Sequence, residues 1–171
     1  LTGLGGQPAL YAFLGRMAET YRLPTPKGSR EKLVANIDRN LLGCGLAAIR
    51  AGQIRGNVGM QHGAMAAAAV ALNSAPETTP ALDWLFDPAG GALPGIIMGR
   101  IDRDGIGDEA SPGYSLGWIG NLSGTASRLA AYGAYKKWDL YRDFPRFTAG
   151  FNITRRPAVL DCTTVKVGDT G

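Results

Sequence analysis

The stretch "VGMQHGAMAAAAVALN", Val58 to Asn73, carries the clearest helix signal in this chain of 171 residues. Alanine has the highest helix propensity, and its small side chain allows a neighbouring helix to pack closely. Upstream, apolar side chains recur at helical spacing from Arg30 to about Gly52, which predicts one long amphipathic helix that begins after Ser29 as a candidate N-cap. The centre of the chain therefore favours helices packed on helices.

The same periodicity predicts further helices on both sides. It marks residues 8–21, a short segment at 82–86, and a helix at 114–137 that contains several glycines. "IIMGRI" at 96–101 fits either a helical turn or a strand, and 138–151 is aromatic and less regular. Strand signals are poor, so we expect an all-α fold of five to seven helices. Helix pairs joined by loops of alternating length suggest a helical repeat or toroid, although no sequence repeat is detectable.

Composition limits the class of protein. With 45% hydrophobic residues the chain can bury one sizeable core, so a single domain over residues 1–171 is expected. The net charge of +4 comes without any run of five or six like charges, which argues against a nucleic-acid partner and suits an acidic polysaccharide. No apolar run reaches the roughly 18 residues of a membrane span.

The two cysteines and the chain ends add little chemistry. Cys44 and Cys162 form no Cys-x-x-Cys pair and have no neighbouring His, so no thiolate metal site is expected. Cys44 lies in a helical apolar run and is predicted to be a buried free thiol. The chain opens at "LTGLGG" without Met and closes at "VKVGDTG". We therefore expect a fragment of a longer protein.

An acidic loop, "DRDGIGDEASPGYSLGW" from Asp102 to Trp118, is compatible with three interpretations. A calcium loop that starts at Asp102 would have Gly107 at its sixth position, but its fifth and twelfth positions, Ile106 and Gly113, offer no side-chain oxygen. No metal or other cofactor is therefore expected.

A plain surface turn is the second interpretation, with Ser111 as N-cap and Pro112 in the first turn of the next helix. It leaves Tyr114 and Trp118 unexplained, since they fall one turn apart on the same helix face. The third interpretation is a loop that positions Tyr114 for catalysis at the start of that helix.

A second polar group surrounds the start of the alanine-rich helix. Asn57 and Gln61 are four residues apart, so their amides point the same way, and His62 lies about 100° round the helix, near enough to share the rim of one pocket. His62 is the only histidine in the chain, and it suits either proton transfer or a hydrogen-bonded structural role. Four arginines flank these segments and would attract carboxylate or sulfate, unless they only form a solvated face: Arg50, Arg55, Arg100 and Arg103.

Two of these stretches together resemble a known family. "GNVGMQHGAMAAAAVAL" followed by "DGIGDEASPGYSLGW" is similar to the heparinase II/III-like polysaccharide lyases, which include alginate lyases. Their α/α toroid carries an Asn-His-Gly helix start and, one helical hairpin later, an acidic loop with Ser-Pro-x-Tyr. Asn57, Gly59 and Tyr114 match this pattern, whereas Val58 stands in the place of the family's His. The closing stretch "DFPRFTAGFNI…VKVGDTG" also looks like the segment before the family's β-sandwich half.

The resemblance implies a fold and a reaction. The fold would be an incomplete α/α toroid that lacks the β-sandwich half. The reaction would be β-elimination in a uronate-containing glycan, in which a base removes the C5 proton and an acid protonates the departing C4 oxygen. Asn57, with Gln61 or His62, would stabilise the enolate-like intermediate, and Tyr114 would act as base, acid or both. The remaining candidates for substrate binding are Arg55, Arg103 and Trp118, the last either as a sugar platform or as packing.

Such a lyase would be secreted or periplasmic, would need no cofactor, and would bind an acidic polysaccharide or oligosaccharide. We expect the isolated 171 residues to have little or no activity without the β-rich half. Two alternatives remain: a non-catalytic glycan-binding toroid, which Val58 in place of the His favours, and a helical scaffold for protein partners.

Overall fold

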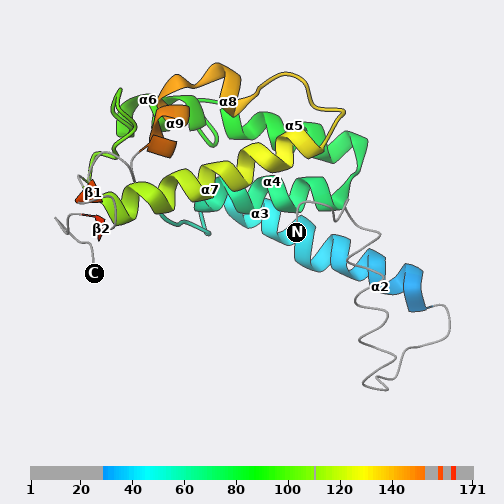
Figure 1. The fold of residues 1–171 in the computed structure, drawn as a ribbon. Helices are drawn as coiled ribbons and strands as arrows, with labels where there is room; N and C mark the ends of the chain where they lie inside the picture. Colours follow the sequence, from blue (N-terminus) through cyan, green and yellow to red (C-terminus); the bar gives the residue numbers. More distant parts are fainter. Residues whose placement is uncertain (1–28, 110, 153–157, 160–162, 165–171) are drawn as a thin grey trace.

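The computed structural model describes residues 29–109, 111–152, 158–159 and 163–164 (Figure 1). The predicted helix at 8–21, Cys162 and most of the closing stretch lie outside the described residues. Within them the all-α class is confirmed, since the described strands are two-residue segments, β1 (Ala158–Val159) and β2 (Thr163–Thr164), which pair antiparallel.

The predicted long helix is confirmed, with one irregularity. α2 (Ser29–Ile37), the π-helical turn η1 (Asp38–Gly43) and α3 (Cys44–Arg50) follow one another without a break and form a single rod (Figure 1). A π-helical turn widens the backbone by one residue per turn, and the apolar periodicity did not predict it.

The prediction that Cys44 is buried is wrong, because the structure places this free cysteine on the exposed side of α3. Leu46 and Ile49 are the residues of α3 that face the core. Cys44 precedes Leu46 by two residues, about 200° round the helix, and therefore points to the opposite side.

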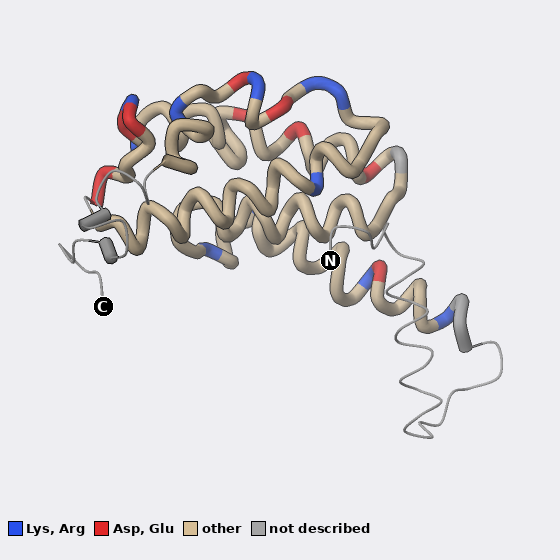
Figure 2. The backbone as a smooth tube through the Cα atoms, in the orientation of Figure 1, with Lys and Arg blue, Asp and Glu red and all other residues tan. Residues whose placement is uncertain are grey.

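The centre of the fold is α4 (Met60–Leu72), which packs against both α5 (Ala75–Phe86) and α7 (Pro112–Ala131). Figure 1 shows α4 and α7 running side by side. Ala66 and Ala69 are fully buried, so the alanines do serve close helix packing as expected. Figure 2 shows these two helices almost free of charged residues, with the charges on the outer segments.

Helix α5 is longer than the short segment predicted at 82–86. It starts at Ala75 because Pro76 fits the first turn of a helix, where its missing N–H costs nothing. The Thr78 hydroxyl donates to the carbonyl of Ala69 over 2.9 Å and accepts from the backbone N–H of Ser74, which joins the start of α5 to α4. The composition of this segment is typical of a loop, and the contact with α4 helps to make the segment helical.

The remaining elements agree in part with those predicted from the sequence. The segment 96–101, for which helix and strand were both open, lies largely in helix α6 (Leu93–Arg100). α7 ends at Ala131, earlier than the predicted 137. The aromatic segment contains α8 (Leu140–Asp143), α9 (Pro145–Ala149) and the 3-10 turn η2 (Gly150–Asn152). None of the described helices combines the length and apolar character that crossing a bilayer requires.

Candidate functional site

The start of α7 has the geometry that the Ser-Pro-x-Tyr sequence predicts. Ser111 is the N-cap, with extended backbone, and its side chain accepts from the Tyr114 backbone N–H over 3.4 Å. Pro112 occupies the first turn. Tyr114 is 36% exposed, so this capped turn presents its side chain at the protein surface.

The acidic loop before this helix is tied down by its own backbone. The N–H of Asp102 donates to the carbonyl of Ile106 over 2.8 Å, and Gly105 turns the chain at φ +91°. The Asp108 carboxylate forms two hydrogen bonds with the Arg100 guanidinium, of 2.9 and 3.1 Å. No three His, Cys, Asp or Glu side chains gather as a metal site anywhere in the described part of the chain.

Trp118 connects α7 to the loop that precedes α4. Its indole N–H donates to Asn57 Oδ1 over 3.1 Å, and its ring is only 1% exposed. The Arg100 guanidinium lies 5.0 Å from the ring centroid, as a cation–π contact requires. Of the two roles considered for Trp118, the structure therefore shows packing, and the buried ring presents no platform for a sugar.

The same contact orients the amide of Asn57. Its Oδ1 accepts from the backbone N–H of Val58 over 3.0 Å as well as from Trp118. Both partners can only donate, so the oxygen rather than the nitrogen must face them. No described residue accepts a hydrogen bond from Asn57 Nδ2, which leaves this N–H₂ group available as a donor. Tyr114 lies one helical turn before Trp118, so the hydrogen bond between Trp118 and Asn57 joins the loop of Asn57 to the first turns of the helix that carries Tyr114.

His62 lies in the core rather than on a pocket rim. It is 1% exposed, and Nε2 lies 2.7 Å from the carbonyl oxygen of Gly91. Because a carbonyl only accepts, Nε2 carries the proton, while Nδ1 is buried and has no hydrogen-bond partner among the described residues. Burial lowers the pKa of His62 below its ordinary value of 6.5, against a smaller opposing effect of the Gly91 hydrogen bond. His62 thus corresponds to the structural alternative, and it does not join Asn57 and Gln61 as expected.

The other predicted binding residues mostly stabilise the loop 51–59, between α3 and α4. Gln61 Oε1 accepts from the Gly56 backbone N–H over 3.2 Å, and Arg55 Nε donates to the Gly52 carbonyl over 3.0 Å. Arg103 is exposed in the acidic turn. The structure thus places Asn57 and Arg55 in the loop before α4, with Gln61 holding that loop from the first turn of α4, and Trp118 links the loop to the helix of Tyr114.

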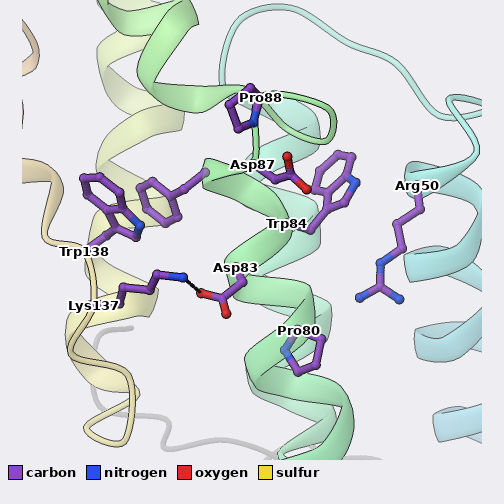
Figure 3. Close-up of a pocket in the computed structure, with 9 residues that line it drawn as sticks. Arg50, Pro80, Asp83, Trp84, Asp87, Pro88, Lys137 and Trp138 are labelled. Carbon is purple, nitrogen blue, oxygen red and sulfur yellow. Dashed lines mark hydrogen bonds and ion pairs between the residues drawn. The ribbon is translucent and has the colours of Figure 1, made fainter.

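A cavity that the sequence reasoning missed lies elsewhere, across the C-terminal part of α5. It has a volume of about 690 Å³ and contains none of the predicted site residues other than Arg50, which was noted only as a flanking cation. Figure 3 shows Arg50 and Trp84 on one side of α5 and Lys137 and Trp138 on the other. The lining residues are Arg50, Pro80, Asp83, Trp84, Phe86, Asp87, Pro88, Lys137 and Trp138.

One signal for this cavity was present in the sequence. Each of its two tryptophans stands next to charged residues, in "LDWLFDP" and in "KKWD", which is unusual for a core position. Nothing in the sequence placed the two segments side by side.

Comparisons with known proteins return no matching family model, no matching curated protein and no matching solved structure. The resemblance to the heparinase II/III-like lyases stays a prediction.

Proposed function

We propose that this chain is part of a polysaccharide lyase that cleaves a uronate-containing glycan by β-elimination, within an α/α toroid of which these helices are one portion. The observation that carries the proposal is the orientation of Asn57. Its amide oxygen is held by Trp118 and Val58, so its N–H₂ group is a fixed donor close to the helix of Tyr114. A donor fixed before the substrate binds costs no reorganisation when charge develops in the transition state.

In this proposal, Asn57 donates a hydrogen bond to the uronate carboxylate. The C5 proton becomes acidic enough to remove only when the charge on that carboxylate is compensated. Gln61, Arg55 and Arg103 are the further candidates for this contact, because amides and guanidinium groups suit a carboxylate.

Tyr114 is the proton-transfer group of the proposal. As a phenolate it takes the C5 proton, the freed electron pair forms the C4–C5 double bond, and the C4–O bond breaks. The same phenol then protonates the departing oxygen, so the tyrosine returns to its initial state. Both steps take place on one face of the sugar, which a single exposed side chain at a helix start can reach.

A second candidate function is glycan binding without catalysis. Val58 occupies the position of the family's His and is buried, and the only histidine in the chain is held by Gly91. The proposed acid–base set therefore rests on Tyr114 alone, which is the feature that favours this alternative.

Turnover of acidic polymers separates the two candidates. The full-length protein is incubated with alginate and with glycosaminoglycans, and the ultraviolet absorbance of the unsaturated uronate product is followed. The proposal expects absorbance to rise with at least one polymer and the isolated 171 residues to be nearly inactive. Binding of these polymers without any rise in absorbance would instead support the non-catalytic alternative. We also propose that such a protein works in the periplasm or outside the cell, where these polymers occur.

A further inference from the structure

The cavity across α5 combines aromatic and charged side chains from three separate segments. α5 and the residues that directly follow it contribute the floor, α3 contributes Arg50, and the segment after α7 contributes Lys137 and Trp138 (Figure 3). Small-molecule sites typically have volumes of roughly 300–1,000 Å³ and few polar groups among hydrophobic ones. The volume of about 690 Å³ lies within that range, although charged side chains make up a larger share of this lining than is typical.

Both indole rings of the cavity are held in place by packing. A Cβ atom on Gly90 would lie 2.7 Å from Trp84 Cδ1, so only glycine allows the turn after α5 to come this close to the ring. The Gly91 backbone N–H also donates to the Trp84 carbonyl over 2.7 Å. Trp138 stacks on Phe86 with 5.1 Å between ring centroids and 11° between ring planes. Each ring thus has one supported side and remains only half-buried.

The charged groups of the cavity are not equivalent. Lys137 Nζ lies 3.1 Å from Asp83 Oδ1, which also accepts from the Tyr135 hydroxyl over 2.9 Å, so Lys137 and one oxygen of this carboxylate already have partners within the protein. Asp87 Oδ1 accepts from the Ala89 backbone N–H over 2.9 Å. Arg50 is exposed at the opposite wall, and no ion pair joins it to another described residue. The cation available to a ligand is therefore Arg50.

We propose that this cavity binds a sugar ring that carries a carboxylate, as a binding subsite separate from the Asn57–Tyr114 site. The C–H face of a pyranose packs against an indole, whose π face is electron-rich. Arg50 binds the carboxylate through two parallel hydrogen bonds, and the remaining carboxylate lone pairs of Asp87 accept from ring hydroxyls. The choice of an acidic sugar rests on the proposed lyase function, whereas the aromatic and arginine contacts do not.

Calorimetric titration with a uronate oligosaccharide tests the subsite. The full-length Tyr114→Phe protein is used, so that the oligosaccharide is not cleaved during the measurement. We expect Arg50→Ala to weaken binding about 10-fold or more, the usual effect of losing a charged hydrogen bond, and Trp84→Ala to weaken it similarly. Arg39→Ala is the matched control, because Arg39 is exposed on the same helical rod but does not line the cavity.

The ligand provides a second, independent comparison. The methyl ester of the same oligosaccharide lacks the carboxylate charge, so it should bind the protein with Arg50 about 10-fold more weakly than the acid does. In the Arg50→Ala protein the affinity difference between acid and ester should shrink about 10-fold, because any difference that is left comes from carboxylate contacts outside the cavity. If Trp84→Ala lowers the melting temperature, Trp84→Phe and the exposed Arg50→Ala still test the subsite in a folded protein.

The outcomes separate this subsite from the lyase proposal. In one outcome the wild-type protein cleaves polymer, but neither Arg50→Ala nor Trp84→Ala changes the affinity for the oligosaccharide. This result overturns the subsite and supports the lyase proposal. Binding that depends on Arg50 and Trp84, without turnover, supports the subsite and overturns the lyase. Trp-lined grooves also bind proline-rich peptides, so Trp84-dependent binding of a polyproline peptide, without saccharide binding, overturns the subsite as well.

Discussion

The indole N–H of Trp118 donates a hydrogen bond to the side-chain oxygen of Asn57 over 3.1 Å, across 61 residues of sequence. This contact fixes the loop before α4 against the first half of α7. It also decides which end of the Asn57 amide faces the protein and which end is left as a donor.

A double-mutant cycle measures this contact directly. Trp118→Phe removes the N–H while keeping an aromatic ring in the core, and Asn57→Ala removes the acceptor. Each should lower the free energy of unfolding, and the double variant should lose about 0.5–1.5 kcal/mol less than the two single losses added together. Urea unfolding monitored by circular dichroism gives the four values. Strict additivity would show that the hydrogen bond contributes nothing to stability.

Tyr114→Phe tests the proposed proton transfer. Because the side chain is 36% exposed and the ring is retained, the free energy of unfolding should change by no more than about 0.5 kcal/mol. If the hydroxyl transfers the proton, kcat/KM should fall about 10²–10⁴-fold while glycan affinity is unchanged. Tyr141→Phe is the control, since Tyr141 is another exposed tyrosine and packs against Phe147 far from Asn57 in the sequence. Near-wild-type turnover by Tyr114→Phe would remove the catalytic assignment.

His62→Ala separates a structural histidine from a catalytic one. The change leaves a cavity in the core and removes the donor to the Gly91 carbonyl, so the free energy of unfolding should fall by about 2–4 kcal/mol. Turnover per folded molecule, measured well below the melting temperature, should stay within about twofold of wild type, since the ring is buried and its Nε2 is engaged by the Gly91 carbonyl. A large loss of turnover in a variant of unchanged stability would return His62 to the catalytic set.

The depressed pKa of His62 makes stability dependent on pH. In the unfolded chain this histidine binds a proton at its ordinary pKa of 6.5, whereas burial lowers its pKa in the folded state. The unfolded state therefore binds more protons below pH 6.5, and stability is lost as the pH falls from there toward the folded pKa. The slope is at most about 1.4 kcal/mol per pH unit for one group.

His62 is the only histidine in the chain, so melting temperatures between pH 7 and 5 should report mainly on it. His62→Gln, which keeps a donor for Gly91 but does not titrate, should flatten the curve over this range. An equally steep curve in His62→Gln would assign the pH dependence to other groups.

Gly59→Ala tests the close approach of α4 to α7. Gly59 has φ +83°, and a Cβ atom there would lie 2.7 Å from Asn121 Cβ, so alanine suffers both backbone strain and a clash. The left-handed conformation alone costs a residue with a Cβ about 1–2 kcal/mol. Gly120→Ala is the matched control, because a Cβ atom there meets nothing within 4 Å, and it should stabilise α7 by about 0.5–1 kcal/mol. Thermal unfolding compares the two, and equal melting temperatures would contradict the packing described.

Much of the helical architecture was predictable from the sequence, because helices depend on neighbours three and four residues away. The alanine-rich helix at 58–73, the long helix from Arg30 and the Ser111 cap all rest on such short-range patterns, and all three are found. The local sequence gave a wrong prediction where a contact between two helices decided the secondary structure. The hydroxyl of Thr78 reaches Ala69 and helps to make α5 helical from Ala75, although that segment had looked like a loop.

The candidate site depended on tertiary structure almost entirely. The sequence placed Asn57 and Tyr114 at two helix starts, but only the fold joined them through Trp118, buried that indole, and turned His62 toward Gly91, 29 residues away. The cavity formed by Arg50, Trp84 and Trp138 likewise combines segments that the sequence keeps apart. A helical pattern indicates which face of each helix is apolar, but packing between distant segments decides which helix covers that face. That packing also decides which polar groups find a hydrogen-bond partner within the protein and which remain available to a ligand.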